Sequence, residues 1–357
     1  MELNKIIFSF SLPLLVFFIS TYLLYFLNKK NFNFLKDDHF NKPQAFHENP
    51  TYRAGGLIIF LSLCIVFFYL FISDKYFVFE YLSFCSLFFI LGFIDDLKVN
   101  IKPKFRLFIM IIFLLTLIIF HEFKIERISL DYLDHLMKID IFALFFICLC
   151  FLFIINGSNL IDGFNGLLSI HSLIILSSLS FINFIYGNYS LAYLLFNVCI
   201  IVLIFIKFNF PKAQMFLGDS GAYLMGTLIA VSAIITNNLI PSISSFFFCI
   251  LLFYLFFEVF FSFFRKIFVE RKNPLLPDRK HLHMLLYNFL LKKNNKKLNS
   301  NYKVSIYINL IYLSLIIPGF IFMHNGLFCR YYFFLLLIIY IYTYKKFYVY
   351  EKIGRRL

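Results

Sequence analysis

The sequence contains no tryptophan among its 357 residues, and charged residues make up only 15% of it. Phenylalanine, by contrast, occurs 55 times. We attribute much of this bias to the base composition of an AT-rich genome, so a single phenylalanine or lysine carries little information. The hydrophobic content of 61% exceeds the roughly one half that is usual in a soluble domain. The composition therefore indicates an integral membrane protein.

Disulfide and metal motifs based on cysteine are also absent. The seven cysteines lie almost all inside apolar runs, and no two of them form a CxxC pair, so we interpret them as small apolar side chains. The first apolar stretch, 6–27, is too long for the hydrophobic region of a typical signal peptide. No small-residue cleavage site follows it, so we expect a membrane helix there.

Long apolar runs dominate what is present. About twenty apolar residues are needed to cross the hydrocarbon core of a bilayer. Eleven such runs indicate an all-α fold, a polytopic integral membrane protein with a single domain and no internal repeat. The expected spans are 6–27, 54–73, 77–94, 105–121, 139–156, 166–186, 189–207, 221–237, 243–264, 304–323 and 330–344.

The distribution of basic residues over the loops distinguishes the two sides of the membrane. Together with two helix-end residues, the loops on one side carry 27 of the 33 lysines and arginines. The positive-inside rule places this side and the C-terminus in the cytoplasm and the N-terminus outside. The net charge of +14 then reflects topology and contact with anionic lipid rather than a nucleic-acid partner. The loops on this side are 28–53, 95–104, 157–165, 208–220 and 265–303, with the tail 345–357.

Two adjacent carboxylates, Asp95 and Asp96, end the third expected helix at its cytoplasmic mouth. A helix C-terminus disfavours anions, and neighbouring carboxylates repel each other, so such a pair attracts a cation or a proton. A polar stop at the membrane surface would need only one lysine. We therefore expect the pair to be functional. Because successive helical residues point about 100° apart, we expect them to make different contacts, one in the groove and one supported by Lys104 or a neighbouring helix.

A second polar cluster follows the fifth expected helix. Asn156, Asn159 and Asp162 recur at every third position, so a helical turn would place them on one face. Their amide and carboxylate oxygens suit Mg²⁺. Three glycines between positions 157 and 166 permit tight turns and close approach of a ligand. A plain connection between helices rarely needs this combination.

Three further clusters are ambiguous when taken alone. Asp219 lies between glycines before an apolar helix, where it could mark an anion site or be only an N-cap. His281 and His283 would diverge on a helix but share a side in extended chain. They lack a third zinc ligand nearby, and beside Arg279 they suit a diphosphate better. Arg53 in the first loop could be only a topology anchor.

All five clusters fall on the same expected face of the membrane. A transporter would place polar residues near mid-membrane, whereas the expected spans are nearly free of charge apart from Glu258, with Arg265 two turns further on. This pattern favours an enzyme over a lipid-linked glycan flippase or another transporter. A CDP-alcohol phosphotransferase would need a DGxxAR-type run, which is absent.

Taken in order, the motifs resemble those of the polyprenyl-phosphate N-acetylhexosamine-1-phosphate transferase family, glycosyltransferase family 4. The chain reads PTYRAGG, GFIDDL, NLIDGFNGL, FLGDSGAYLMG and PDRKHLHMLL, and the match runs from about Lys42 to Leu286. The resemblance implies ten or eleven helices with a cytoplasm-facing groove in the inner membrane. It also implies transfer of a sugar-1-phosphate from a UDP-sugar to undecaprenyl or another polyprenyl phosphate, with release of UMP. The implied cofactor is Mg²⁺, with Mn²⁺ as the alternative.

The resemblance also implies individual roles. Asp95 and Asp96 would engage the lipid phosphate, one of them as a general base, and Lys104 would contact phosphate. Asn159 and Asp219 would be magnesium ligands. The remaining residues would bind the donor or lie beside it, with Asn165 at the uracil and a loop closing over the substrate. These residues are Asp162, Asn165, Arg279, His281, His283 and Arg53.

Two departures from the family pattern bear on the substrate. Met284 stands where many members have another histidine, so the triple-histidine signature of the phospho-N-acetylmuramoyl-pentapeptide transferases is absent. Asn165 stands where many bacterial members have aspartate. The pattern is nearer to enzymes that begin O-antigen, capsule or similar surface-glycan synthesis than to the peptidoglycan branch. The oligomeric state stays open, with a homodimer among the alternatives.

Overall fold

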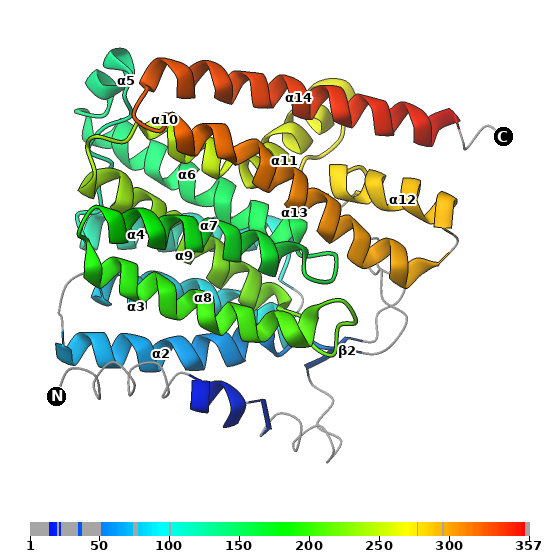
Figure 1. The fold of residues 1–357 in the computed structure, drawn as a ribbon, viewed down its shortest axis with the longest axis horizontal. Coiled ribbons are helices and arrows are strands. Elements are labelled where there is room, and N and C mark those ends of the chain that lie inside the picture. The colour runs from blue at the N-terminus through cyan, green and yellow to red at the C-terminus, as the bar shows by residue number, and fades with distance from the viewer. Residues whose placement is uncertain are drawn as a thin grey trace.

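The structure is a computed structural model, and its helices pack side by side in a bundle (Figure 1). It describes residues 14–19, 21–22, 35–37, 51–73, 78–99, 101–276, 278–294 and 296–353. Within these ranges, nine helices are long and apolar enough to cross a membrane, and the total is ten if one bent helix pair is counted as a single span. The prediction of an all-α polytopic membrane protein is confirmed. The first expected span, 6–27, lies mostly outside the described residues.

The described spans follow the expected order. They are α2 (Gly55–Ser73), α3 (Val78–Asp96), α4 (Pro103–Phe120), α6 (Asp140–Ile161), α7 (Leu167–Ile185), α8 (Tyr189–Asn209), α9 (Gly218–Leu239), α13 (Lys297–Ile321) and α14 (Gly326–Ile353). Shorter elements are the paired strands β1 (Lys36–Asp37) and β2 (Thr51–Tyr52) and the helices α5 (Asp131–Leu136) and α12 (Leu282–Asn294).

The expected span 243–264 is apolar enough to cross a membrane, but it is broken rather than continuous. This stretch forms α10 (Ser245–Leu251) and α11 (Phe253–Phe264), which are bent by 74° and continue into a π-helical turn, η2 (Arg265–Val269). The carbonyl of Leu251 at the bend accepts a hydrogen bond from the hydroxyl of Tyr312 on α13. A neighbouring helix thus satisfies a polar group at the break, which is how broken helices are tolerated within a membrane.

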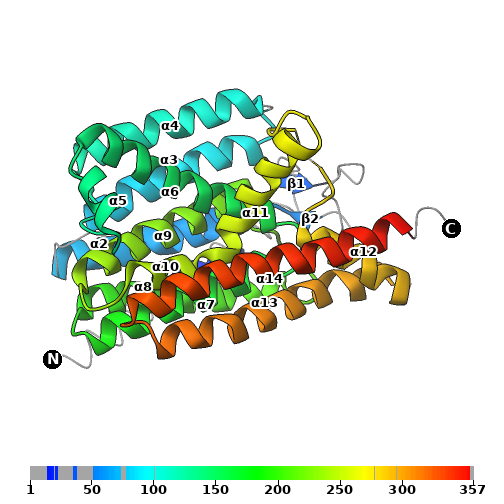
Figure 2. The ribbon, with the colours of Figure 1, turned by 90° about the horizontal axis from the view of Figure 1, so that it is seen from above.

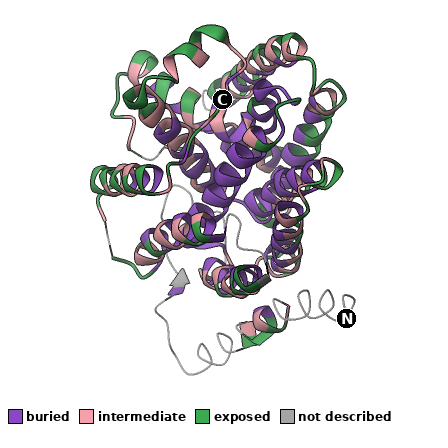
Figure 3. Cartoon of the chain, turned by 90° about the vertical axis from the view of Figure 1, so that its left-hand side faces the viewer, coloured by how far each residue is buried: buried purple, intermediate pink, exposed green. Residues whose placement is uncertain are grey.

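The helix α9 forms the centre of the bundle. In its membrane stretch 89% of the residues are buried, against 17% to 56% in the other long described spans. Figure 3 shows the buried residues gathered in the middle and the exposed ones on the outside. Small residues permit this packing: a Cβ on Gly226 would lie 2.7 Å from the Cα of Ile155 on α6, and one on Gly56 of α2 would lie 2.3 Å from the backbone N of Gly221.

The motif-bearing segments meet at one end of the bundle, where β2 and α12 also lie (Figures 1 and 2). Several residues expected in loops are helical instead. The last turns of α6 contain 157–161, the first turn of α9 contains 218–220, and α12 with the start of α13 occupies most of 282–303. The site is therefore built largely on helix ends, which hold side chains more firmly than free loops do.

Candidate active site

The carboxylate of Asp96 joins the end of α3 to the start of α9. Asp96 is 2% exposed, and its oxygens accept hydrogen bonds from the backbone N–H groups of Asp219 and Ser220, both at 2.9 Å. The hydroxyl of Ser220 donates a third bond of 2.6 Å. The first N–H groups of a helix have no partner within that helix, so Asp96 caps α9 from another helix.

Two motif glycines make this contact possible. Gly218 has a φ of +74°, and a Cβ on it would lie 2.5 Å from Oδ2 of Asp96. A Cβ on Gly92 of α3 would lie 2.5 Å from the backbone N of Ser220. A larger residue at either position would force the carboxylate away from the helix start, because the obstructing atoms are backbone or the carboxylate itself.

Arg53 reaches the same carboxylate from the start of α2. Its Nη1 lies 3.8 Å from Oδ1 of Asp96. Backbone bonds hold it there: the N–H of Phe216 donates to the carbonyl of Tyr52, and the N–H of Gly55 donates to the carbonyl of Phe216. Arg53 therefore lies beside Asp96 in the candidate site, and its predicted role in substrate binding stays a prediction.

Asp95 makes different contacts from its neighbour, as expected. Arg106 on α4 donates a hydrogen bond of 2.7 Å from Nη1 to Oδ2 of Asp95, and the same nitrogen lies 3.8 Å from Oδ2 of Asp219. The guanidinium also lies over the ring of Tyr223, 5.8 Å from its centre. Arg106 thus connects the acidic ends of α3 and α9 with a cation.

The predicted support from Lys104 is not seen. Lys104 is exposed, and within the described part of the chain its side chain has no hydrogen-bond or ion-pair partner. Sequence reasoning missed Arg106. The spacing of the two residues indicates that they cannot share a role. Side chains at positions 104 and 106 point roughly 200° apart on a helix, so only one of them can face α3. The predicted phosphate contact of Lys104 stays a prediction.

Asn159 and Asp219, the two predicted metal ligands, come together. Asn159 lies in the last turns of α6, and its Nδ2 is 3.4 Å from Oδ1 of Asp219. Mg²⁺ is commonly held by one or two carboxylates together with substrate phosphates and water, so this oxygen-rich pair fits that ion. Among the described residues, no three His, Cys, Asp or Glu side chains are grouped to hold a metal.

Asp162 follows the last residue of α6 and adds to the acidic character. Burial, followed by the negative charge of Asp219, raises the pKa of Asp162 to about 8, although Arg53 opposes this shift. Asp219 and Asp96 both add negative charge close to this carboxyl group. Such an environment favours a bound cation.

Asn165 is anchored in the connection between α6 and α7. It is 5% exposed, its Nδ2 donates to the carbonyl of Pro211, and its backbone N–H donates to Oδ1 of Asn301 on α13. The next residue, Gly166, donates to Oδ1 of Asn209. Asn209 and Asn301 were missed from sequence because neither belongs to a recognised motif. The predicted contact of Asn165 with uracil stays untested.

His281 and His283 share a side of the chain, as expected, but both are buried. Their rings are stacked with centres 5.4 Å apart. They face Glu258 on α11, with Nδ1 of His281 3.1 Å from Oε2 and Nδ1 of His283 3.6 Å from Oε1. The two histidines therefore hold the loop against α11.

Ion pairs also hold the loop that contains Asp278 and His281. Arg265 donates to Oε1 of Glu270 at 2.6 Å and to Oδ2 of Asp278 at 2.7 Å. Burial alone would raise the pKa of Asp278, but His281, the N–H of Lys280 and Arg265 together lower it to about 2. Arg279 lies between these anchored residues and is exposed, so it is available to meet an anion.

Comparison with known proteins identifies relatives. Residues 78–237 match the model of the family described as glycosyl transferase family 4. An undecaprenyl-phosphate alpha-N-acetylglucosaminyl 1-phosphate transferase from Thermotoga maritima is 28% identical over 267 residues, which are 75% of this chain and 77% of the relative. A phospho-N-acetylmuramoyl-pentapeptide-transferase from Campylobacter jejuni is 30% identical over 256 residues, 62% of this chain and 72% of the relative.

We expect Asp96→Asn to destabilise the protein. An amide offers one oxygen to the two backbone N–H groups and turns its own N–H₂ toward a donor, so bonds to a charged acceptor worth about 1.5–3 kcal/mol each are weakened. The thermal unfolding temperature in detergent should fall, and amide exchange should increase at the start of α9. Asp219→Asn is the matched control and should change neither, because the Asp219 side chain makes only long contacts. Equal losses in both variants would contradict the capping role.

Proposed function

The chain belongs to glycosyl transferase family 4, and from this premise we propose that it transfers a sugar-1-phosphate from a UDP-sugar to a polyprenyl phosphate, releasing UMP. One observation carries the proposal. At one end of a membrane bundle, Asn159 and Asp219 approach within 3.4 Å, beside the ion pair of Asp95 and Arg106. The oxygens of Asn159 and Asp219 thus lie next to the cation of Arg106. A lipid phosphate and a nucleotide diphosphate would have to meet at this place.

The names of the relatives support this reaction class. The Thermotoga protein is named for undecaprenyl phosphate and N-acetylglucosaminyl 1-phosphate, and the Campylobacter protein for a phospho-N-acetylmuramoyl-pentapeptide. We favour an N-acetylhexosamine-1-phosphate and a surface glycan such as O-antigen or capsule. This choice rests on the departure from the family motif, in which Met284 stands in place of a third histidine. Transfer of a phospho-N-acetylmuramoyl-pentapeptide is the second candidate, since the Campylobacter relative is 30% identical.

The proposed reaction is a displacement at phosphorus. An oxygen of the lipid phosphate attacks the β-phosphorus of the UDP-sugar as the bond to UMP breaks. Bound at Asn159 and Asp219, Mg²⁺ would neutralise charge on the phosphoryl oxygens. Arg106 adds a fixed positive charge beside that position, and the exposed Arg279 is placed to contact the diphosphate.

Asp95 and Asp96 would have different roles. Both oxygens of Asp96 are occupied by α9, so Asp96 positions the site. Asp95, held by a single arginine, is the member able to meet the lipid phosphate. A phosphate monoester has its second pKa near 6, so proton removal contributes little to the rate. We propose that the site faces the cytoplasm in the inner membrane, on the strength of the basic loops at this end.

In the direct test, the purified chain is incubated with undecaprenyl phosphate, Mg²⁺ and a panel of UDP-sugars. The mass of the lipid product is then measured by mass spectrometry. We expect one product heavier than the acceptor by an N-acetylhexosamine phosphate, together with stoichiometric UMP. A product formed only from UDP-N-acetylmuramoyl-pentapeptide would favour the second candidate. No lipid product from any nucleotide-sugar, with the chain folded, would refute the reaction class.

Arg106→Gln should lower kcat by about 10²–10³, the usual cost of removing one donor that stabilises developing charge. Arg330→Gln is the matched control. Arg330 lies on α14 at the opposite end of the bundle, where it donates to the carbonyl of Ser129, so kcat should not change. Lys104→Gln should act mainly through KM, because its exposed side chain can meet only bound substrate. An unchanged kcat in Arg106→Gln would remove Arg106 from the mechanism.

A further inference from the structure

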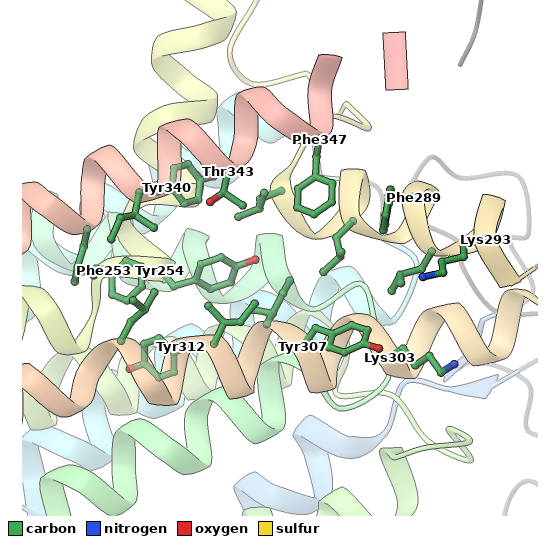
Figure 4. A pocket seen from close by; sticks show the side chains of 18 residues that line it. Phe253, Tyr254, Phe289, Lys293, Lys303, Tyr307, Tyr312, Tyr340, Thr343 and Phe347 are labelled. Atoms are coloured by element: carbon green, nitrogen blue, oxygen red, sulfur yellow. The ribbon is translucent and has the colours of Figure 1, made fainter. Parts of the chain in front are cut away.

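A cavity lies apart from the carboxylates of the candidate active site, between α11, α12, α13 and α14. Its volume is about 530 Å³, within the range of roughly 300–1,000 Å³ for small-molecule sites. Figure 4 shows aromatic residues, among them Phe253, Tyr312 and Tyr340, toward one end and two lysines, Lys293 and Lys303, at the other. We call it the α12–α14 cavity. Its shape is that of an apolar channel with a cationic mouth.

Among the described residues, no acidic side chain forms an ion pair with either lysine at the mouth. Neither side chain has a hydrogen-bond or ion-pair partner anywhere in the described ranges. The adjacent Lys292 differs, because its Nζ lies 5.7 Å from the ring centre of Tyr350. Two cations from different helices at one opening create a positive potential that favours an anion.

The cavity is accessible from the membrane. Tyr307 and Ile311, on the wall formed by α13, are 45% and 56% exposed on the outer surface of a membrane helix. The lysines lie where α12 and α13 meet, at the end of the bundle that carries the basic loops (Figures 1 and 2). The apolar part thus lies at the depth of lipid chains, and the cationic mouth at the depth of lipid phosphates.

We propose that the α12–α14 cavity binds an anionic phospholipid, with an acyl chain along its aromatic wall and the phosphate between Lys293 and Lys303. Burial of acyl-chain methylene groups and the attraction of each lysine to an anionic headgroup both favour this binding. The inference does not depend on the proposed function. The carboxylates of the candidate active site lie on or beside α3, α6 and α9, and none of them lines this cavity.

Occupancy would reach the active site through α12. Leu282 and Leu286 line the cavity, and His281, which precedes α12, is bonded to Glu258. Tyr254, another lining residue, lies one turn before Glu258 on α11. A lipid wedged between these helices would hold the loop that carries Arg279. The bound phospholipid would then act as a structural part of that loop.

The test measures binding of phosphatidylglycerol and phosphatidylcholine to the purified full chain by native mass spectrometry, with thermal unfolding in parallel. We expect phosphatidylglycerol to bind at least tenfold more tightly than phosphatidylcholine and to raise the unfolding temperature. The double variant Lys293→Gln/Lys303→Gln should lose this preference, whereas the charge-matched variant Lys292→Gln/Lys296→Gln should keep it. Thr343→Phe, which fills the cavity, should weaken both lipids.

Three results would overturn the proposal. Equal losses in the two lysine pairs would show only general attraction to a basic surface. Unchanged binding in Thr343→Phe would place the lipid elsewhere. Displacement of phosphatidylglycerol by stoichiometric undecaprenyl phosphate, with equal sensitivity to Lys293→Gln/Lys303→Gln, would identify the cavity as a site for the acceptor lipid. Unfolding temperatures without added lipid show that each variant is folded, so a loss of binding is interpretable.

Discussion

A buried carboxylate at the end of one membrane helix accepts the free N–H groups at the start of another, and the active site depends on that contact. Asp96 lies at the C-terminus of α3, where the helix dipole opposes its charge, but at the N-terminus of α9, where the dipole favours it. The contact fixes the position of Asp219 opposite Asn159. It also leaves Asp95 to pair with Arg106, so two adjacent acids acquire separate tasks.

The same contact explains the glycines around it. Gly92 and Gly218 leave room for the carboxylate and the helix start, and Gly56 lets α2 approach α9. Without a hydrophobic driving force between helices in lipid, close packing of small residues and hydrogen bonds must hold them together. The loop with Arg279 is held differently, because Glu258 contacts His281 and Arg265 forms an ion pair with Asp278.

The sequence predicted the features that depend on local composition. The apolar runs located ten of the expected spans, and the spacing of polar motifs predicted that Asp219 and Asn159 would share a face of the membrane. The break at Leu252 could not be predicted, because no proline or glycine marks it and the satisfying hydroxyl comes from Tyr312. The choice of Arg106 over Lys104 depends on how α4 is rotated against α3, and the burial of His283 depends on α11. Contacts of this kind depend on how helices pack in the folded protein, so a single sequence does not predict them.

We propose that the start of α9, anchored on Asp96, forms a divalent metal site together with the end of α6. The most direct measurement is the anomalous diffraction of Mn²⁺ in crystals of the chain grown with UDP. The account predicts one peak within bonding distance of an Asp219 oxygen and the amide oxygen of Asn159, with the diphosphate completing the coordination. A peak bound by Asp95 and Asp96 instead, with Asp219 unliganded, would contradict it.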